Sequence, residues 1–458
     1  MNLLGGPDTR PIHFMGIAGA GMSALAELFL RRGASVTGCD IDPSGAPDLA
    51  RLGLEVINGH DAAHVGNARA VVVTSAVPRD HPELARARAL GIPVVRRAEA
   101  LGGAVSGGTV VAVAGTHGKT TTTAMTTEAL AAAGLSPTGL AGGRVASWHG
   151  NLRPGEGRLF VVEADEYDRS FLSLAPTVAI VTNVEADHLD VYDGLEDISR
   201  AFEQFLAPAS TVIACADDAG AAALSPPAGA EVVSYGIGTA PARLAGTGIM
   251  TVEGRLRFLV RFDGQDLGEL ALRVPGVHNV RNALAAIAAG LCLGTTLEAM
   301  RRGLEEFEGV ERRFQRLGSV RGVQVVDDYA HHPTEITATL EAARAAFPGR
   351  RLVVAFQPHL FTRTRDFAEG FGQALSRADA VFLAEIYPAR EEAIPGVTAG
   401  LVEDALRRAG ANAAWRGERS DLAAALAASA REGDVVITLG AGDITRTGPE
   451  LLQRLAVP

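Results

Sequence analysis

Residues 110–123, VVAVAGTHGKTTTT, decide the fold class of the central part of this 458-residue chain. An apolar, β-branched run leads into Gly115-Thr116-His117-Gly118-Lys119-Thr120, and a helical stretch follows. Glycines let backbone N–H groups turn toward an anion, and the start of a helix adds its dipole. A lysine here reaches terminal phosphates, and Thr120 can ligate Mg²⁺. The stretch therefore predicts a strand, a phosphate-binding loop and a helix, although Val113 replaces the first glycine of the usual GxxxxGK[ST] pattern.

Lys119 is the one lysine among 42 basic residues, and every other basic position is arginine. Its survival inside the glycine loop indicates chemistry that needs a compact ammonium group rather than a planar guanidinium group. One alternative is that a single lysine is present by chance, and another is that the glycines form an ordinary turn that binds no ligand. The position of the lysine in the loop favours a nucleotide site. The predicted phosphate contacts are Gly115, Thr116, Gly118, Lys119, Thr120 and Thr121.

Bulk composition narrows the class of protein. The length predicts two or three domains, and the net charge of −11 argues against a nucleic-acid binder. Three scattered cysteines without a CxxC pair predict neither a disulfide framework nor a zinc site. The N-terminus does not resemble a secretory signal. The longest apolar run, Ala283 to Leu297, is short for a membrane span and predicts a buried helix. We expect a cytoplasmic protein that acts without a membrane.

The rest of the chain alternates β-rich apolar runs with helical stretches, which predicts α/β layers around parallel sheets. The predicted strands are Ile12–Met15, Val71–Thr74, Val110–Ala114, Leu159–Glu163, Val178–Thr182, Leu352–Phe356, Ala380–Ala384 and Val435–Leu439. The predicted helices are Met22–Arg32, Thr120–Ala133, Arg281–Leu291 and Glu335–Ala346.

Composition changes divide the chain into three expected domains, residues 1–105, 106–315 and 316–458. A glycine-rich join, LGGAVSGGT, separates the first two. The middle domain contains the one clear hairpin-like stretch, Leu244 to Val274, with turns at Glu253-Gly254 and Asp263-Gly264.

Acidic side chains follow two of the predicted strands. Glu163, Asp165, Glu166 and Asp168 come after the strand in LFVVEADEYDRSF, and Asn183, Asp187, His188 and Asp190 follow the next strand. The carboxyl ends of parallel strands face the crevice where ligands bind in such sheets. Beside a phosphate loop, Glu163 would hold the magnesium ion that bridges nucleotide phosphates. The two strand ends predict a two-metal site that includes His188, and the alternative is a solvated acidic turn with a structural histidine.

The N-terminal stretch HFMGIAGAGMSALAELF predicts a strand, a glycine turn and a helix. Gly16, Gly19, Gly21 and Ser23 lie in the turn and at the helix start, and the next strand ends at Asp40. This Rossmann-like pattern suits a diphosphate, with the acidic residue near a ribose. The turn reads GxxGxG rather than GxGxxG, so its spacing is a weak signal when taken alone. NAD is the usual expectation from a Rossmann-like domain considered by itself.

Seven motifs in a fixed order resemble the Mur ligase family, and most closely its alanine-adding branch: GTHGKTTTT, EADEYDRSF, TNVEADHLDVY, PGVHNVRNALAA, RRFQRLG, DDYAHHPTE and FQPHLFTRTRD. The similarity runs from GIAGAGMS near the start to GAGDI near the end. It implies a Rossmann-like UDP-binding domain, a central P-loop ATPase-like domain with a mostly parallel sheet, and a C-terminal Rossmann-like domain. It also implies ATP-dependent joining of L-alanine to UDP-N-acetylmuramate through an acyl phosphate, a step in making peptidoglycan.

The resemblance also implies roles for particular residues. Thr120 and Glu163 would hold one Mg²⁺ and Glu163 with His188 a second, with Mn²⁺ as an alternative ion; Lys119, Glu163 and His188 would be the catalytic groups. UDP replaces NAD in the first domain, where VTSAVP with Ser75 resembles a second contact loop. The remaining implied contacts are Asn279 and Asn282 for adenine, Arg313 and Asp327 for the nucleotide, and Tyr329, His331 and Arg363 for the amino acid.

Three readings compete within and beyond this family. Several sibling ligases use a second, carbamylated lysine, which this chain does not have, so the alanine-adding branch fits better. The nearest alternative is a murein peptide ligase that adds a recycled tripeptide to UDP-N-acetylmuramate. A weaker alternative is a dinucleotide-binding oxidoreductase or sensor.

Some relatives carry arginine in place of Leu360, so the residue that binds the alanine carboxylate in this chain stays open. A monomer or a homodimer is expected.

Overall fold

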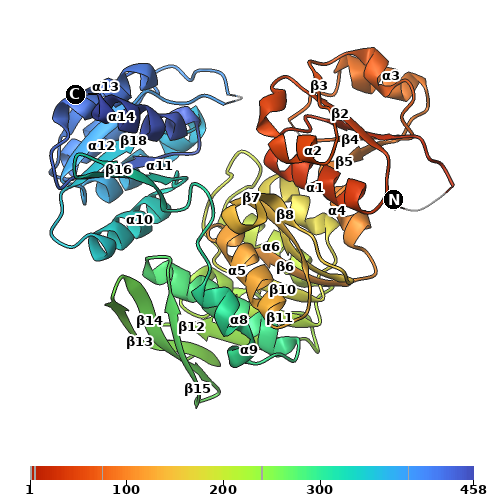
Figure 1. Cartoon of the computed structure of the whole chain (residues 1–458), viewed down its shortest axis with the longest axis horizontal. Coiled ribbons are helices and arrows are strands. Elements are labelled where there is room, and N and C mark those ends of the chain that lie inside the picture. The colour runs from red at the N-terminus through yellow and green to blue at the C-terminus, as the bar shows by residue number, and fades with distance from the viewer. Residues whose placement is uncertain (1–2, 5–6, 75, 239–240, 390, 458) are drawn as a thin grey trace. The chain divides into compact units, whose positions relative to one another are not determined.

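The computed structural model describes residues 3–4, 7–74, 76–238, 241–389 and 391–457. The chain forms two compact units. The first contains residues 1–248, 258–271 and 280–308, and the second contains residues 249–257, 272–279 and 309–458. Within the described residues the strands form three sheets, of five, ten and six strands (Figure 1).

The first sheet is parallel and has the order β3-β2-β1-β4-β5. Four buried residues of β1 agree with a central strand that is covered on both faces. Its elements are β1 (Ile12–Met15), α1 (Ala20–Arg31), β2 (Val36–Asp40), η1 (Pro43–Gly45), α2 (Pro47–Arg51), β3 (Ile57–Asn58), η2 (Ala62–Val65), β4 (Ala70–Val73), α3 (Pro82–Ala89), β5 (Val94–Arg96) and α4 (Arg97–Val105).

The second sheet has the order β15-β14-β13-β12-β11-β10-β6-β9-β7-β8. Its strands are β6 (Thr109–Ala114), β7 (Thr138–Val145), β8 (Gly150–Arg153), β9 (Leu159–Glu163), β10 (Val178–Val181), β11 (Thr211–Cys215), β12 (Glu231–Gly236), β13 (Leu244–Val252), β14 (Arg255–Phe262) and β15 (Gln265–Leu272). Its helices are α5 (Lys119–Ala132), η3 (Ala146–Trp148), η4 (Tyr167–Ser173), α6 (Leu195–Leu206), α7 (Ala219–Ala223), α8 (Val277–Cys292) and α9 (Leu297–Glu305).

Strand order in the second sheet positions the site. Strand β6 lies between β9 and β10 and is parallel to both, with Val113 opposite Glu163 and Ala114 opposite Val181. The carboxyl ends of these three strands therefore meet at one edge of the sheet. The loop that follows β6 lies beside the acidic residues that follow β9 and β10.

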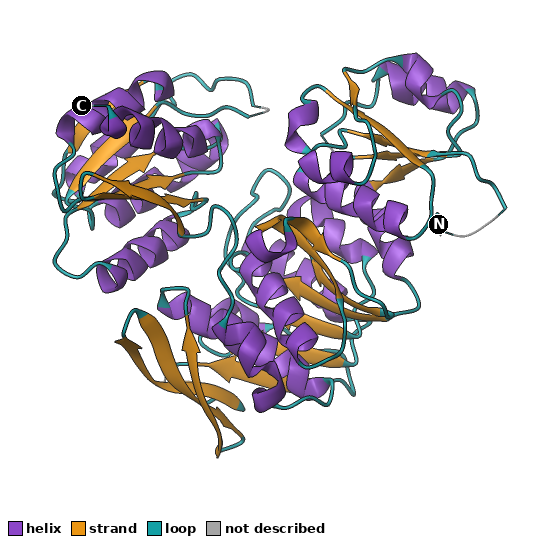
Figure 2. Ribbon diagram, viewed as in Figure 1, coloured by secondary structure: helices purple, strands orange, loops and turns teal. Residues whose placement is uncertain are grey.

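The third sheet has the order β16-β17-β21-β18-β19-β20 and is covered on both faces (Figure 2). Along β21, Ile437 packs into the core with α10, α11 and α12, whereas Val436 packs into the core with α13 and α14. Its elements are β16 (Gln315–Val320), β17 (Val323–Asp328), α10 (Pro333–Ala346), β18 (Leu352–Phe356), α11 (Phe361–Leu375), β19 (Ala380–Ala384), α12 (Gly400–Arg408), β20 (Ala413–Gly417), α13 (Arg419–Ser429), β21 (Val435–Leu439), η5 (Asp443–Arg446) and α14 (Thr447–Ala456).

The predicted strands and helices are confirmed, with ends that shift by a few residues at most. Helix α8, which covers most of the long apolar run, is largely buried. None of the described helices combines the length and hydrophobicity that spanning a bilayer requires. The α/β class with three domains is confirmed, and the boundaries at 105/106 and 315/316 stay predictions.

The expectation of a single hairpin-like stretch is wrong. Its predicted turns are present, because Glu253, Gly254, Asp263 and Gly264 all have positive φ between strands. Two further antiparallel pairs exist, however, β7 with β8 and β16 with β17.

Candidate active site

The loop between β6 and α5 has a backbone that requires glycine at two places. Gly115 has φ +137° and Gly118 has φ +81°, which other residues rarely adopt. A Cβ at Gly115 would overlap Thr182 Oγ1, and one at Gly118 would lie 2.9 Å from Asn282 Oδ1. The positive φ of Gly118 immediately before helix α5 leaves the first N–H groups of that helix available to an anion.

Residues at the end of β10 hold this loop in place. The backbone N–H of Thr116 donates to Asn183 O (3.0 Å), and that of His117 donates to Asn183 Oδ1 (2.8 Å). In return, Thr182 Oγ1 donates to His117 O (2.6 Å) and Asn183 Nδ2 donates to the same oxygen (3.1 Å). The adjacent strand thus fixes the loop conformation before any ligand binds.

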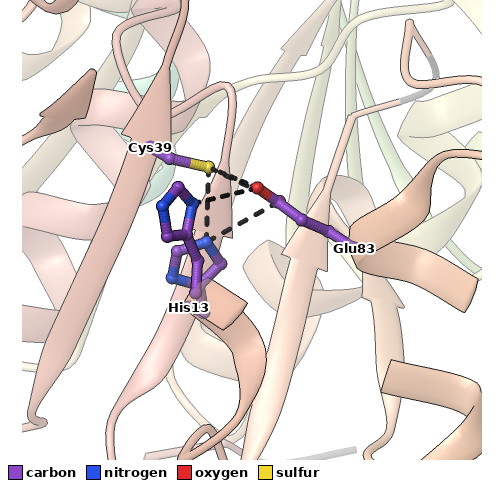
Figure 3. Close-up of side chains that lie close together, drawn as sticks. His13, Cys39 and Glu83 are labelled. Carbon is purple, nitrogen blue, oxygen red and sulfur yellow. Dashed lines mark hydrogen bonds and ion pairs between the residues drawn. The ribbon is translucent and has the colours of Figure 1, made fainter. Parts of the chain in front are cut away.

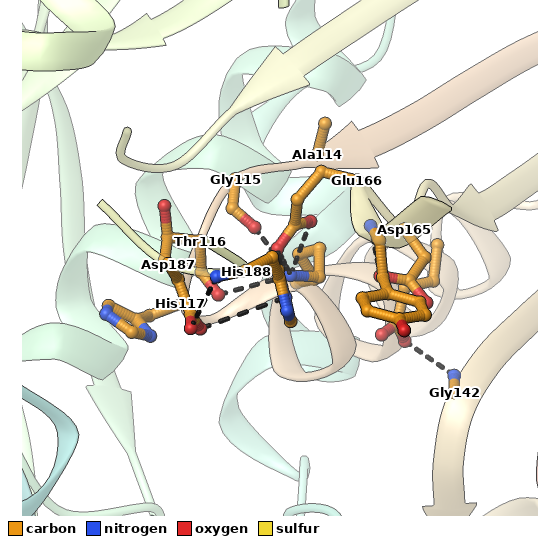
Figure 4. Close-up of polar contacts among 12 residues, drawn as sticks. Ala114, Gly115, Thr116, His117, Gly142, Asp165, Glu166, Asp187 and His188 are labelled. Atoms are coloured by element: carbon orange, nitrogen blue, oxygen red, sulfur yellow. Dashed lines mark hydrogen bonds and ion pairs between the residues drawn. The ribbon is translucent and has the colours of Figure 1, made fainter. Parts of the chain in front are cut away.

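The ammonium group of Lys119, whose side chain is 13% exposed, forms an ion pair with Glu166 (2.8 Å). Figure 4 shows Glu166 and His188 close to Gly115 and Thr116 of the loop. Its Nζ donates to Glu166 Oε1 (2.9 Å), Gly115 O (2.6 Å) and Thr116 O (3.1 Å). Burial alone would lower the pKa of Lys119, but the charges of Glu166 and Asp165 outweigh it and raise that pKa. The one lysine of the chain is therefore a protonated cation at the centre of the loop.

Glu163 and Thr120 lie together on the other side of the loop. Thr120 Oγ1 donates to Glu163 Oε1 (3.0 Å), and the Gly142 N–H donates to Glu163 Oε2 (2.5 Å). Burial raises the pKa of Glu163 despite these hydrogen bonds. A hydroxyl and a half-buried carboxylate with neutral hydrogen-bond partners are oxygen ligands that suit a hard divalent cation. The pair predicted to hold one Mg²⁺ is therefore adjacent in the structure.

His188 lies beside Glu166, on the same side as Lys119. Its Nε2 is 3.4 Å from Glu166 Oε1 and 3.8 Å from Asp187 Oδ2, and its backbone is left-handed with φ +51°. Burial by itself lowers the pKa of His188, but the hydrogen bond that its ring donates to Glu166 and the charge of Asp187 raise that pKa overall. The predicted pairing of His188 with Glu163 at a metal ion stays a prediction.

Glu166 is the residue whose importance the sequence did not reveal. It was one of four acidic residues after β9, and the structure selects it as the carboxylate that contacts both Lys119 and His188. Burial raises its pKa, yet the charges of Lys119 and His188 outweigh that effect and lower it. Glu166 is thus an ionised carboxylate that orients two predicted catalytic groups.

Replacing Glu166 by glutamine should lower the pKa of His188, because the hydrogen bond and the negative charge that stabilise the imidazolium are lost. Metal binding requires the neutral imidazole. Activity should therefore fall off at a lower pH in Glu166→Gln than in the unmodified protein. At neutral pH the loss in kcat/KM should be roughly tenfold to a hundredfold, as for other partners of metal ligands.

The check is an NMR titration of the histidine side chains, with His188→Gln to assign the resonance. Glu156→Gln, a change at an exposed glutamate in the loop between β8 and β9, is the control. An unchanged His188 titration in Glu166→Gln would contradict the proposed coupling.

The glycine turn of the first domain is organised by the end of β2. The Cys39 carbonyl accepts from the N–H groups of Gly16 (2.9 Å) and Ile17 (3.1 Å), and Asp40 Oδ2 accepts from the Ala18 N–H (2.9 Å). Gly16 has φ +71°. Asp40 therefore fixes the turn, in addition to its predicted role near a ribose.

Other predicted contacts of this domain lie around the same turn. Gly19 caps α1, a Cβ at Gly21 would lie 2.8 Å from Arg97 Nη1, and Ser23 Oγ donates to Ala20 O (3.1 Å). Ser75 lies outside the described residues.

The two predicted adenine contacts lie in the first two turns of α8. In the first unit, Asn282 Oδ1 accepts from Thr122 Oγ1 (3.1 Å), which ties it to the helix after the phosphate loop. In the second unit, Asn279 Nδ2 donates to Pro275 O (2.6 Å). Asn282 therefore lies beside the phosphate loop within the first unit. The contacts of Asn279 and Asn282 with adenine stay predictions.

The nucleotide contacts predicted in the second unit lie at the carboxyl end of β17. Asp327 accepts from Thr438 Oγ1 (2.5 Å) and Thr445 Oγ1 (2.8 Å) and lies 3.4 Å from Arg312 Nε. Arg313 forms an ion pair with Glu335 (3.2 Å). Arg312, which the sequence did not single out, lies against the ring of Tyr329, 4.7 Å from its centroid, as does Arg313 at 5.2 Å.

The predicted amino-acid contacts gather in the same unit. His331 Nδ1 lies 3.0 Å from Tyr329 O and 3.2 Å from Glu335 Oε2. His359 has its ring 6.3 Å from that of His331, and Arg363 is buried on α11. Leu360, at the start of α11, has φ +72°, an unusual backbone for leucine.

Burial raises the pKa of Asp328 to about 6, and its carboxylate accepts from the N–H groups of Phe314 and Ala330, each at 2.8 Å. Asp328 thereby shapes the segment that carries Tyr329 and His331.

A glycine loop with one buried ammonium group, between a parallel strand and a helix, defines a nucleotide-phosphate site of the P-loop class. Three family models match the chain: the Mur ligase family catalytic domain over residues 11–108, the Mur ligase middle domain over 113–290, and the Mur ligase glutamate ligase domain over 312–442.

Two curated relatives and two solved structures are similar along nearly the whole chain. UDP-N-acetylmuramate–L-alanine ligases of Kineococcus radiotolerans and Renibacterium salmoninarum are 48% and 46% identical, over 97% and 98% of this chain and 96% and 97% of theirs. The structure of a UDP-N-acetylmuramate–alanine ligase from Thermotoga maritima has a TM-score of 0.84 at 33% identity, covering 97% of this chain and 99% of that one. A murein peptide ligase from Psychrobacter arcticus has a TM-score of 0.71 at 26% identity, covering 98% and 99%.

The chain belongs to the Mur ligase family. It is an ATP-dependent ligase that forms an amide bond.

Proposed function

We infer that this ligase joins the amino group of L-alanine to the carboxylate of UDP-N-acetylmuramate, in the synthesis of peptidoglycan precursors. The supporting observation is that relatives named for this reaction are 43–48% identical over 97–98% of the chain. We further propose that it acts in the cytoplasm, without nucleic acid or membrane partners, as a monomer or homodimer.

The reaction divides into two balanced steps. In the first, an oxygen of the muramate carboxylate forms a bond to the terminal phosphorus of ATP, and the bond to the bridging oxygen of ADP breaks. In the second, the alanine ammonium group first loses a proton, and its nitrogen lone pair then forms a bond to the acyl carbon. The bond from that carbon to the phosphate oxygen breaks, and the nitrogen loses a second proton, which leaves the amide. Inorganic phosphate takes up one of the two protons and solvent the other. Negative charge spreads over the phosphoryl oxygens in the first step and over a tetrahedral centre in the second.

The residues around the loop support this chemistry. The loop N–H groups and the ammonium group of Lys119 would bind the terminal phosphate, and Glu166 holds that ammonium group in place. Thr120 and Glu163 would hold one Mg²⁺, and Glu163 with His188 a second, with Mn²⁺ as an alternative ion. When bound, the metal ions would neutralise the negative charge on the phosphoryl oxygens.

The other two domains would bind the remaining substrates. Gly16, Gly19 and Gly21 would contact the diphosphate of UDP. In the second unit, Arg363 or His331 would orient the alanine carboxylate, since a buried guanidinium group suits a planar anion. Some relatives carry arginine at the position of Leu360, at the start of the same helix. Because this chain has leucine there, the group that binds the alanine carboxylate would be another residue, Arg363 or His331.

Phosphate release tests the proposal. With ATP and UDP-N-acetylmuramate, release should become sustained when L-alanine is added and stay low without it. The tripeptide L-Ala–γ-D-Glu–meso-diaminopimelate should not replace L-alanine. Turnover with the tripeptide alone would assign the chain to the murein peptide ligases, and NAD(H) binding without ATP turnover would support an oxidoreductase or sensor.

A further inference from the structure

A second group of metal-binding side chains lies inside the first domain, away from the phosphate loop (Figure 3). It consists of His13 on β1, Cys39 on β2, His64 in η2 and Glu83 on α3. One ligand atom from each lies within 4.8 Å of all the others. The side chains of His13 and Glu83 are 0% exposed, and Cys39 is buried.

The spacing of these atoms fits a four-coordinate site. His13 Nε2 lies 3.3 Å from Cys39 Sγ, Glu83 Oε1 lies 3.4 Å from the same sulfur, and His64 Nδ1 lies 3.1 Å from Glu83 Oε1. Ligands of a tetrahedral zinc ion are roughly 3.3–3.6 Å apart, from the usual zinc–ligand bond lengths. His13 Nε2 lies farther, 3.9 Å, from Glu83 Oε2, and all four ligand atoms lie within 4.8 Å of one another. The side chains would therefore have to draw together by up to about 1 Å to surround one ion.

The polar atoms of the cluster lie close to one another and to neighbouring polar groups. Cys39 Sγ lies within 3.5 Å of a ring nitrogen of His13, a ring nitrogen of His60 and the carboxylate of Glu83. Likewise, the Asp61 N–H is shared between His64 Nδ1 (3.2 Å) and Glu83 Oε1 (2.9 Å), two atoms that carry lone pairs.

Charge balance points the same way. Within the described part of the chain, the ion pairs of the buried Glu83 carboxylate are with histidines alone. A divalent cation, one thiolate, one carboxylate and two neutral imidazoles sum to zero charge, which suits a largely buried site.

We propose that His13, Cys39, His64 and Glu83 form a structural Zn²⁺ site beneath the glycine turn of the first domain. On binding, the S–H bond of Cys39 breaks, a sulfur–zinc bond forms, and the proton leaves to the buffer. Thiolate and imidazole ligands select zinc over magnesium, so this site is chemically distinct from the catalytic one.

Neighbouring residues complete the site. His13 Nδ1 lies 3.0 Å from Thr37 Oγ1, a contact that directs Nε2 toward the ion. The carbonyl of Cys39 accepts from the Gly16 and Ile17 N–H groups of the glycine turn. Zinc bound at Cys39 therefore stabilises the end of β2 and, through it, the turn predicted to bind UDP.

The full-length protein, stripped of metals with a chelator, tests the site by titration with Co²⁺ and Zn²⁺ in excess Mg²⁺, which occupies the catalytic site. We expect about one equivalent of either ion to bind, a thiolate-to-cobalt charge-transfer band, and a higher Tm with Zn²⁺. The band should vanish in Cys39→Ser. Zinc affinity should fall by more than about tenfold in His64→Gln, because removing a ligand costs more than removing one of its partners.

Cys215→Ser is the matched control, because Cys215 is also buried but lies on β11 of the second sheet. This variant should keep the band and the affinity. His64 is partly exposed, so His64→Gln keeps the test decisive if Cys39→Ser does not fold. A protein that binds no stoichiometric cobalt, or a band that persists in Cys39→Ser, would overturn the proposal.

Discussion

Replacing Lys119 by methionine should lower kcat/KM by a factor of about 10³ or more. This loss equals or exceeds the one seen in other enzymes when a single hydrogen-bond donor to the transition state is removed. Methionine keeps much of the apolar stem but removes the charge that would face the transferring phosphoryl group. It also leaves Glu166 without the cation that now contacts it at 2.8–2.9 Å. Buried negative charge near the phosphates then opposes ATP binding as well.

Lys119→Arg separates charge from shape. The guanidinium group keeps the positive charge, but its planar fork does not fit three acceptors around one nitrogen, on Gly115, Thr116 and Glu166. We expect this variant to recover little of the lost activity. Phosphate release assays at saturating alanine measure both, and full activity in Lys119→Met would remove the basis of the proposed mechanism.

The single lysine also permits a direct chemical test. An amine-reactive reagent can modify Lys119 and the N-terminal amine, and no other amine in the chain. ATP should protect Lys119 from modification, with peptide mass spectrometry as the measurement. Equal labelling with and without ATP would place the nucleotide away from the loop.

Replacing Glu163 by glutamine should lower kcat/KM by roughly 10²–10³ and raise the Mg²⁺ concentration needed for half-maximal rate. The amide keeps the size and can still accept the hydrogen bonds from Thr120 and Gly142. The loss is therefore one of negative charge at the proposed metal ligand rather than of folding. Rate measurements across a range of Mg²⁺ and Mn²⁺ concentrations test this.

Asp168→Asn is the matched control for Glu163→Gln. Asp168 belongs to the same acidic stretch, but its carboxylate lies 3.7 Å from Arg96 and is more exposed. We expect near-normal rates and a normal Mg²⁺ requirement from it. An unaltered Mg²⁺ requirement in Glu163→Gln would exclude Glu163 as a ligand.

Strands and the phosphate loop were predictable because their signals are local. The runs at 12–15, 159–163, 352–356, 380–384 and 435–439 are short, apolar and β-branched, and the structure has a strand with the same bounds at each. Two antiparallel strand pairs, β7 with β8 and β16 with β17, were not predicted, and the reasons are local as well. Strand β7 reads TGLAGGRV, whose glycines mask any alternation, and β16 and β17 are joined by Arg321-Gly322 rather than by a common turn pair.

The sequence by itself determined the class of fold, the phosphate loop, the place of the Glu163 carboxylate beside that loop, and the family. Each of these depends on residues that are consecutive or on motifs in a fixed order. Tertiary structure alone decided that Glu166 contacts Lys119 and His188, that Asn183 holds the loop, and that Cys39 meets two histidines and Glu83. The physical reason is that strand order and register bring these side chains together. Neither can be read from spacing along one chain, because β6 lies between β9 and β10 in the sheet but comes before both in the sequence, separated from β9 by β7 and β8.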